Sequence, residues 1–264
     1  MVQQPRVALV TGASSGIGAA FARVLAERGW DLVISARRRD RLVRLREEIT
    51  ARHAVRVTAV ENDLDTTLGA QRLFDEVQAL EPLVSMLINN AGFGTYGPVA
   101  EQDLRTIHSM IQVNVTSLTT LARLYAAQMC GQGHGYLLNV ASFAAFQPIP
   151  RYAVYSGAKA YVVAFSQALR HELRGTGVRV SVLAPGFTAT EFHTVARHRR
   201  TRLMHLTTLD AQRVARLGVA GLLQGRPLII PGWWYRTVAV ANRALPRTVA
   251  SALAAWIVGS GEGP

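Results

Sequence analysis

The stretch from Val7 to Gly18, VALVTGASSGIG, constrains the fold of this chain more than any other. Its β-forming residues give way at Thr11-Gly12 to a glycine-dense turn, and Ala19 to Arg28 then has apolar residues at helical spacing. A strand, a tight loop and a helix N-terminus therefore follow one another directly. Such a helix end attracts phosphate, because it presents unpaired backbone N–H groups and the positive end of a dipole.

The loop residues are candidates for the wall of a nucleotide site. Glycine is needed where a side chain would block a pyrophosphate or where φ is positive, and serine hydroxyls add donors. The spacing departs from G-x-G-x-x-G, so an ordinary glycine-rich loop remains the alternative. The candidate cofactor-binding residues here are Gly12, Ser14, Ser15, Gly16, Ile17 and Gly18.

Length and composition favour one substantial domain, since the chain has 264 residues and is 49% hydrophobic. We find no secretory signal and no run of about 20 apolar residues, and the single cysteine, Cys130, is expected in the core. These features favour a cytoplasmic protein.

The formal net charge of +12 raises nucleic acid as a partner. The arginines, however, are scattered along the chain without interleaved aromatic residues, so we expect no nucleic-acid partner. Among the 29 lysines and arginines, Lys159 is the one lysine.

A second run, Asp31 to Ser35, reads as a strand and is followed by Ala36 and Arg37. In dinucleotide-binding folds an acidic residue at this strand end binds ribose hydroxyls, whereas an arginine accommodates a 2′-phosphate. Arg37 therefore favours NADP(H) over NAD; a solvated helix start at Asp40 is the alternative.

Two later strand ends carry further candidate cofactor contacts. Asp63 is placed to accept a hydrogen bond from adenine, with Leu64 beside the ring, unless Asp63 caps the following helix. Small and amide residues after the next strand let a cofactor lie against backbone; these are Asn90, Ala91 and Gly92. The expected strands are Val7–Val10, Asp31–Ser35, Val55–Val60, Leu83–Ile88, Gly135–Val140, Val178–Leu183 and Pro227–Ile230.

TGASSGIG at residues 11–18, NDL at 62–64, NNAG at 89–92 and a later serine, tyrosine and lysine resemble the short-chain dehydrogenase/reductase family. The match runs from about Arg6 to Pro231. Alternating strands and helices already predict an α/β sheet with right-handed crossovers. The resemblance implies a single-domain Rossmann fold, a doubly wound, seven-stranded parallel sheet with helices on both faces.

Tyr155 and Lys159 lie four residues apart in a helical stretch from Tyr152 to Arg174, so they share one face. An adjacent ammonium is expected to lower the tyrosine pKa from about 10 and make it a general acid/base. Ser142 follows a strand and is placed to hydrogen-bond a carbonyl oxygen as it becomes negative. An exposed Tyr–Lys contact is the alternative.

The resemblance implies a catalytic tetrad of Asn114, Ser142, Tyr155 and Lys159. Asn114 would hold a water of a proton relay, near the middle of a helix expected from Glu101 to Met129; a structural amide is the alternative. Lys159 would also bind the nicotinamide ribose. The carboxamide would be seated by the turn that contains Pro185, Gly186 and Thr188. The family also implies a homodimer or homotetramer.

The C-terminal part carries less specific signals. Residues 187–208 become polar, with interspersed arginines and histidines, and we interpret them as a substrate lid without a diagnostic metal spacing. The extension from 232 to 264 is apolar and contains three tryptophans. It could rest on a membrane, close over an apolar substrate or pack on a second subunit.

These features together predict an NADPH-dependent enzyme that interconverts carbonyls and alcohols, with a hydrophobic ketone or aldehyde as its small-molecule substrate. One alternative is a catalytically idle NADP-binding regulator or scaffold. Another is a peripheral membrane protein that uses its basic, tryptophan-bearing tail.

Overall fold

The computed structural model describes residues 6–81, 83–189, 207–242, 246, 248–249 and 251–252. Its strands are β1 (Val7–Thr11), β2 (Asp31–Ala36), β3 (Val57–Glu61), β4 (Val84–Asn89), β5 (Gly135–Val140), β6 (Val178–Leu183) and β7 (Leu228–Ile229). Within the described residues they form one seven-stranded parallel sheet in the order β3-β2-β1-β4-β5-β6-β7. The expected doubly wound sheet is confirmed.

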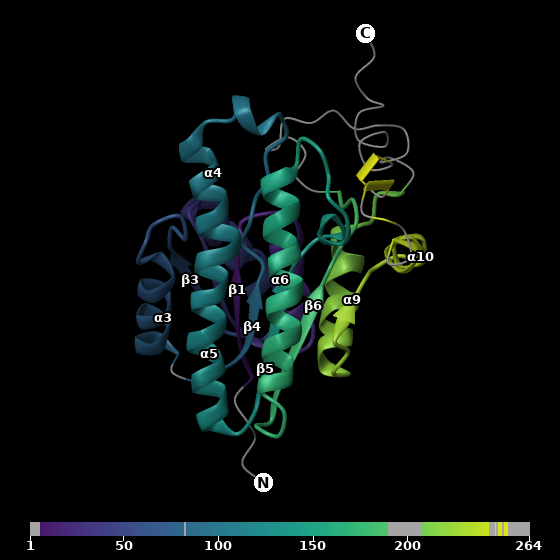
Figure 1. Ribbon diagram of the computed structural model, residues 1–264. Coiled ribbons are helices and arrows are strands. Elements are labelled where there is room, and N and C mark those ends of the chain that lie inside the picture. The colour runs from purple at the N-terminus through teal and green to yellow at the C-terminus, as the bar shows by residue number, and fades with distance from the viewer. Residues whose placement is uncertain are drawn as a thin grey trace.

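Helices cover both faces of this sheet (Figure 1). They are α1 (Gly16–Ala26), α2 (Arg39–Thr50), α3 (Gly69–Leu80), α4 (Leu104–Ile111), α5 (Leu118–Gln132), α6 (Ala153–Glu172), α9 (Ala211–Leu223) and α10 (Trp233–Ala241). Short 3₁₀ turns, η1 (Val99–Glu101) and η3 (Phe143–Phe146), and a π-helical stretch, η2 (Gln112–Ser117), complete the described elements. One face packs on α1, α2 and α9, and the other on α3, α5 and α6.

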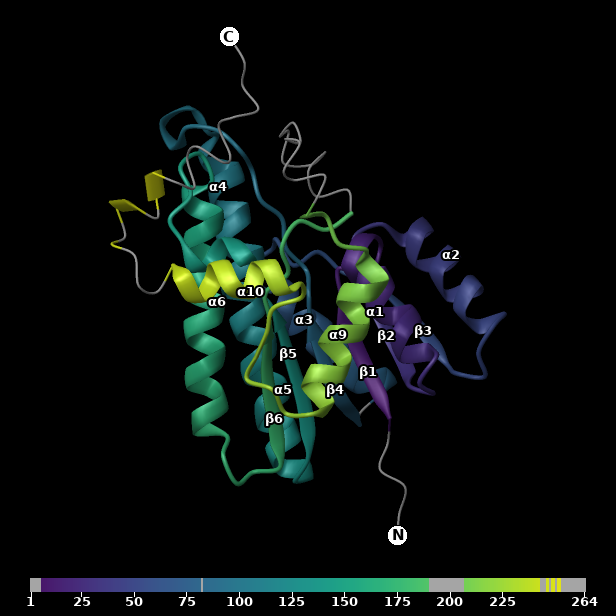
Figure 2. The same ribbon diagram turned by 90° about the vertical axis from the view of Figure 1, so that its right-hand side faces the viewer.

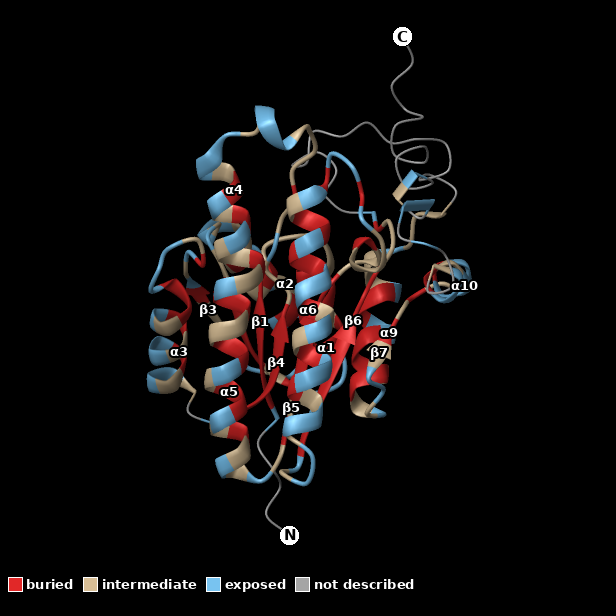
Figure 3. Ribbon diagram, viewed as in Figure 1, coloured by how far each residue is buried: buried red, intermediate tan, exposed pale blue. Residues whose placement is uncertain are grey.

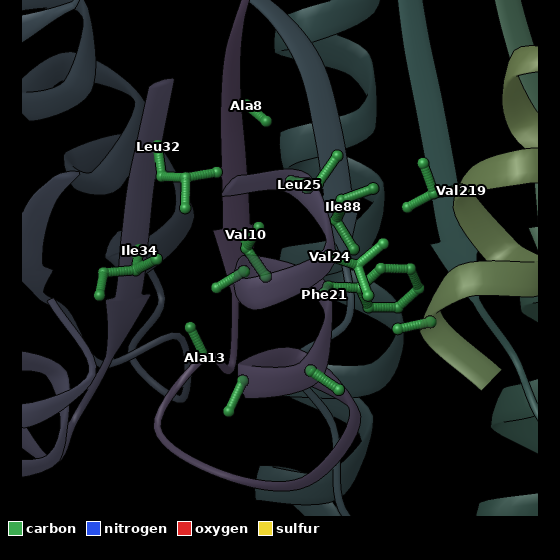
Figure 4. Close-up of a cluster of buried hydrophobic side chains, with 14 of the residues drawn as sticks. Ala8, Val10, Ala13, Phe21, Val24, Leu25, Leu32, Ile34, Ile88 and Val219 are labelled. Atoms are coloured by element: carbon green, nitrogen blue, oxygen red, sulfur yellow. The ribbon is translucent and has the colours of Figure 1, made fainter. Parts of the chain in front are cut away.

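The core consists of two apolar layers, one on each face of the sheet (Figure 3). Side chains of a strand alternate between the faces, so Ala8 and Val10 join one layer while Val7 and Leu9 join the other. Figure 4 shows part of the first layer, where β1, β2 and β4 meet Phe21, Val24, Leu25 and Val219. Because both faces are covered, the central strands are mainly apolar.

The strand order reverses at β1. The chain adds β2 and β3 on one side of β1 and then returns to add β4 on its other side. Val10 is level with Ile34 of β2 and with Ile88 of β4. The loops that follow β1 and β4 therefore begin side by side at the carboxyl edge of the sheet. Ligands of open α/β sheets bind in the crevice at such a point.

The expectation of one continuous helix from Glu101 to Met129 is wrong. A 3₁₀ turn comes first, α4 begins at Leu104, and the six residues of η2 separate α4 from α5. A π-helical turn accommodates an extra residue and is frequent at functional sites. Here η2 contains Asn114, whose side-chain Nδ2 donates to Met110 O of α4 at 2.9 Å.

The C-terminal helix α10 lies crosswise to α6 and α9 near the carboxyl edge of the sheet (Figure 2). Most of the expected lid, residues 190–206 with its histidines and arginines, lies outside the described residues, as does most of the tail after 242. The boundary expected near 231 stays a prediction. In the part of the chain that is described, no helix is both long and apolar enough to span a bilayer.

Thr11 joins the two loops at this edge. It is fully buried, and its hydroxyl oxygen accepts hydrogen bonds from Asn90 N and Ala91 N, each at 3.0 Å. The hydroxyl thus holds the start of the loop after β4 against the end of β1.

Replacing Thr11 by Val keeps the side-chain shape but removes this acceptor. We expect Thr11→Val to lower the free energy of unfolding by roughly 1–3 kcal/mol, because Ala91 N loses its acceptor, whereas Asn90 N keeps a hydrogen bond to Ile88 O. Thr11→Ser, the matched control, keeps the hydroxyl and is expected to cost about 1 kcal/mol for the lost methyl group. Urea denaturation of the wild type and both variants measures these changes, and a Thr11→Val protein as stable as the wild type would contradict the role of the hydroxyl.

Candidate active site

A cavity of about 530 Å³ opens at the carboxyl edge of the sheet. Every cofactor-binding residue expected from the sequence lines it, and so do Ser142, Tyr155 and Lys159. Asn114 does not line the cavity and is fully buried behind Gly92. The structure therefore brings together segments that are far apart in the chain.

The glycine loop is closed too tightly for side chains at its key positions. Gly12 and Gly16 have φ values of 68° and 55°, in the left-handed region that favours glycine. A Cβ on Gly18 would lie 2.3 Å from Gly12 O. The loop thus presents backbone and the hydroxyls of Ser14 and Ser15 to the cavity.

Arg38 is the cation that contacts this loop. Its Nε and Nη2 donate to Ser14 Oγ at 3.1 and 3.0 Å, and Nη2 donates to Ser15 Oγ at 2.7 Å. A guanidinium beside two hydroxyls at a helix N-terminus forms a site suited to a phosphate group. Our sequence reasoning missed Arg38, although it follows Arg37 directly after β2.

Arg37 also lines the cavity but is more exposed. Its side chain is 66% exposed, and Nη1 lies 4.0 Å from Asp63 Oδ1. The two arginines give the outer end of the cavity a positive charge, partly offset by Asp63. Nothing in the sequence ranks one arginine above the other.

Asp63 and Leu64 lie at the same end of the cavity. Asp63 Oδ1 accepts from Asp65 N at 3.0 Å in a turn. The alternative that Asp63 caps the next helix is wrong, because α3 begins at Gly69. Leu64 is only 8% exposed and supplies an apolar contact.

The loop after β4 forms the cavity floor with Asn90, Ala91 and Gly92. Asn90 Nδ2 donates to Thr11 O at 2.9 Å, so this side chain braces the end of β1. A Cβ on Gly92 would lie 2.5 Å from Asn114 Oδ1 and 3.2 Å from Lys159 Nζ. Only glycine leaves room for these two polar groups.

The amide of Asn114 is hydrogen-bonded through its nitrogen, whereas its oxygen has no partner among the described residues. Its Nδ2 donates to Phe93 O at 2.8 Å and to Met110 O at 2.9 Å, which fixes the amide. Its Oδ1 is buried and has no hydrogen-bond partner among the described residues. A buried acceptor without a partner is costly, and such atoms point to a functional or water-mediated role.

Ser142, Tyr155 and Lys159 converge at the inner end of the cavity. Tyr155 is hydrogen-bonded to Ser142, which follows β5, and Ser142 Oγ also accepts from Ala144 N at 3.1 Å. Lys159 Nζ donates to Val140 O at 3.0 Å and lies 5.8 Å from the centre of the Tyr155 ring. The alternative of an exposed Tyr–Lys pair is wrong, because Tyr155 and Lys159 are 9% and 3% exposed.

Burial dominates the electrostatics of this pair. It raises the pKa of Tyr155 to about 12, with an opposing effect of the hydrogen bond to Ser142, and it lowers the pKa of Lys159 to about 8. The expectation that the ammonium lowers the tyrosine pKa is therefore wrong in direction. The loss of solvation outweighs the opposing hydrogen bond to Ser142.

The turn after β6 closes the site. Phe143 N donates to Pro185 O at 2.8 Å, which joins this turn to the segment that follows Ser142. Thr188 Oγ1 donates to Gly186 O at 3.0 Å and is 6% exposed. Pro185, Gly186 and Thr188 all face the cavity, as the sequence predicts.

Aromatic and aliphatic side chains surround the rest of the inner end. Phe187 lies in the expected lid, and Trp234 and Val238 lie in the extension that is expected to be able to close over an apolar substrate. Sequence reasoning did not identify the others, because isolated apolar residues carry no motif. These lining residues include Phe93, Ile149, Tyr152, Phe187, Trp234 and Val238.

Comparisons with known proteins agree with this geometry. The family model described as short chain dehydrogenase matches residues 6–201. The chain is 38% identical over 188 residues to Sulfoacetaldehyde reductase 2 of Chromohalobacter salexigens, which covers 70% of this chain and 74% of that protein.

Two solved structures are also similar. The short-chain dehydrogenase from Sphingobium yanoikuyae in complex with NADPH has a TM-score of 0.81 and 29% identity, over 91% of this chain and 94% of that one. The bulky-bulky ketone specific alcohol dehydrogenase from Comamonas testosteroni has a TM-score of 0.78 and 26% identity, over 92% and 94%. The chain therefore belongs to the short chain dehydrogenase family, oxidoreductases that act on carbonyl and alcohol groups with a nicotinamide cofactor.

Proposed function

We propose that this protein is an NADPH-dependent reductase of a hydrophobic ketone or aldehyde. One observation carries the proposal. The cavity has two arginines and two serines at its outer end, and a half-buried serine with a buried tyrosine and lysine within an apolar inner end. The similarity to a dehydrogenase that binds NADPH and to a ketone-specific alcohol dehydrogenase supports it.

The residues present fit a phosphorylated dinucleotide. Ser14, Ser15, Arg37 and Arg38 would hold its phosphates, and Lys159 lines the other end of the cavity. When bound, NADPH supplies a hydride to a carbonyl carbon. The absence of an acidic residue at Ala36 and Arg37 favours the 2′-phosphate over a free ribose hydroxyl.

Side chains of the protein would supply the rest of the chemistry. Negative charge grows on the carbonyl oxygen during reduction, so the oxygen needs hydrogen-bond donors and then a proton. Ser142 Oγ would donate a hydrogen bond to this oxygen, and Tyr155 would donate the proton. A pKa of about 12 keeps the phenol protonated at neutral pH, the form that an acid requires.

Lys159 and Asn114 would serve the tyrosine. The ammonium, with a pKa of about 8, is charged at neutral pH and lies close enough to stabilise the developing phenolate. Asn114 Oδ1 would accept a hydrogen bond from a water that returns a proton to this pair. Arginine would fit poorly at position 159, because the planar guanidinium is larger than an ammonium.

Replacing Tyr155 by Phe tests the acid. We expect the rate of ketone reduction to fall by about 10²–10⁴-fold, because the proton donor is lost, while NADPH affinity stays nearly unchanged. The matched control is Tyr161→Phe, on the same helix but 38% exposed and hydrogen-bonded to Thr119 Oγ1. Steady-state kinetics and NADPH fluorescence measure both quantities. A Tyr155→Phe enzyme with near-native turnover would reject the role.

The buried ammonium predicts a pH dependence. Burial lowers the pKa of Lys159 to about 8, so the charge is present below this pH and is lost above it. We expect kcat/KM for reduction to decline as pH rises through about 8, while Tyr155, with a pKa of about 12, keeps its proton. Lys159→Arg, which stays charged, is expected to be slow but without this decline. A flat wild-type profile up to pH 10 would contradict the assignment.

Cofactor preference is tested by removing charge from each arginine. Arg37→Gln and Arg38→Gln are each expected to raise the NADPH dissociation constant by about 10-fold or more, with a smaller effect on NADH, because a charge-assisted phosphate contact is lost. Arg39→Gln is the control, since Arg39 is exposed and does not line the cavity. If both variants lost the same affinity for NADPH and for NADH, the assignment of Arg37 and Arg38 to the 2′-phosphate would be wrong.

A further inference from the structure

The side chains of α10 fall into distinct faces with different surroundings. Trp234 and Val238, four residues apart, lie on one face, and both line the cavity. Tyr235 is buried, with 4% exposure. Trp233 and Val240 are turned outward and are 76% and 66% exposed. The helix therefore presents Trp234 and Val238 to the cavity and buries the side chain of Tyr235.

Tyr235 attaches α10 to the turn after β6. Its hydroxyl accepts from Phe187 N and donates to Thr207 O, each at 3.0 Å. Its ring occupies the space beside Gly186, where a Cβ would lie 2.1 Å from Tyr235 Cζ. The ring and the hydroxyl together leave little freedom in the position of the helix.

A second set of contacts ties α10 to the segment after the predicted catalytic serine. The Tyr235 ring lies 5.1 Å from the ring of Phe143, which follows Ser142. Just beyond the helix, Asn242 Nδ2 donates to Gln147 Oε1 at 2.6 Å. The helix is thus anchored on both segments that border the inner end of the cavity.

We propose that α10 is the wall that selects the substrate by size. Trp234 and Val238 contact the part of the carbonyl compound that points away from Tyr155, and Tyr235 is the positioning residue that holds this wall. The proposal rests on the reductase function proposed above.

The same wall indicates the substrate class. Among the described lining residues, charged side chains occur only in the predicted cofactor and catalytic sites; they are Arg37, Arg38, Asp63 and Lys159. The wall beside α10 is aromatic and aliphatic, with amide and hydroxyl groups as its polar atoms. Such a surface fits a bulky, apolar ketone, because burying the apolar groups of the substrate against these side chains is favourable.

Two identical substitutions on α10 test the proposal. Val238→Trp fills the cavity, whereas Val240→Trp adds the same side chain to the exposed face. The probes are alkyl phenyl ketones from acetophenone to octanophenone, with propanal as a small aldehyde. We expect Val238→Trp to lower kcat/KM for the longest accepted ketone by about 10-fold or more relative to propanal, because the added ring overpacks the site. Val240→Trp is expected to leave the ratio unchanged.

Two further variants keep the test decisive if Val238→Trp does not fold. Trp234→Ala enlarges the cavity and is expected to shift the preferred ketone to a longer chain. Tyr235→Phe keeps the ring and removes both hydrogen bonds, so we expect KM for the long ketone to rise about 10-fold while kcat changes little. A merely structural role of Tyr235 would lower the melting temperature without changing the ratio of KM values between long and short substrates.

The outcomes separate the two proposals. If the wild-type protein oxidises NADPH with none of the probes, the reductase function is contradicted. The proposed selection by α10 is then contradicted as well, because it rests on that function. A wild-type enzyme that reduces the ketones, with a length preference unchanged in Val238→Trp and Trp234→Ala, overturns the role of α10 alone. A preference that changes in these variants and not in Val240→Trp supports it.

Discussion

Parallel pairing at the centre of the sheet is the constraint on which the site depends. The register aligns Val10 of β1 with Ile88 of β4, and Asn89 of β4 with Asn139 of β5. Parallel strands end at the same edge, so their following loops start at nearly the same level. The glycine loop, the loop after β4 and Ser142 therefore meet although up to about half the chain separates them. No single one of these loops forms the cavity.

The single lysine has a role that its surroundings explain. Lys159 is 3% exposed, and burying an ammonium is costly unless polar groups compensate. Val140 O accepts one of its three N–H bonds, and Gly92 leaves room on the side where Asn114 Oδ1 lies. The chain otherwise uses arginine, and a compact ammonium suits this position because the larger, planar guanidinium would fit poorly between β5 and the loop after β4.

Much of the fold could be predicted from the sequence, and what could not has physical reasons. The strands Gly135–Val140 and Val178–Leu183 have the predicted bounds, because each is a mainly apolar run that follows a glycine-containing turn. The π-helical turn contains Asn114, whose side chain donates to Phe93 O in another loop, and a local pattern does not report such a contact. The direction of the Tyr155 pKa shift depends on burial, which the Tyr–Lys spacing does not reveal.

The cavity also explains why family membership identifies the reaction more readily than the substrate. The matched region, residues 6–201, contains the glycine loop, Arg38 and the predicted catalytic tetrad. Trp234, Tyr235 and Val238 lie beyond it, on α10. The groups that would move a hydride and a proton thus come from one part of the chain, and the wall that contacts the rest of the substrate comes from another. The described contacts of α10 run to Phe143 and to the turn after β6, so we expect a side-chain change on its cavity face to alter the size of the cavity more than the placement of the buried tyrosine and lysine.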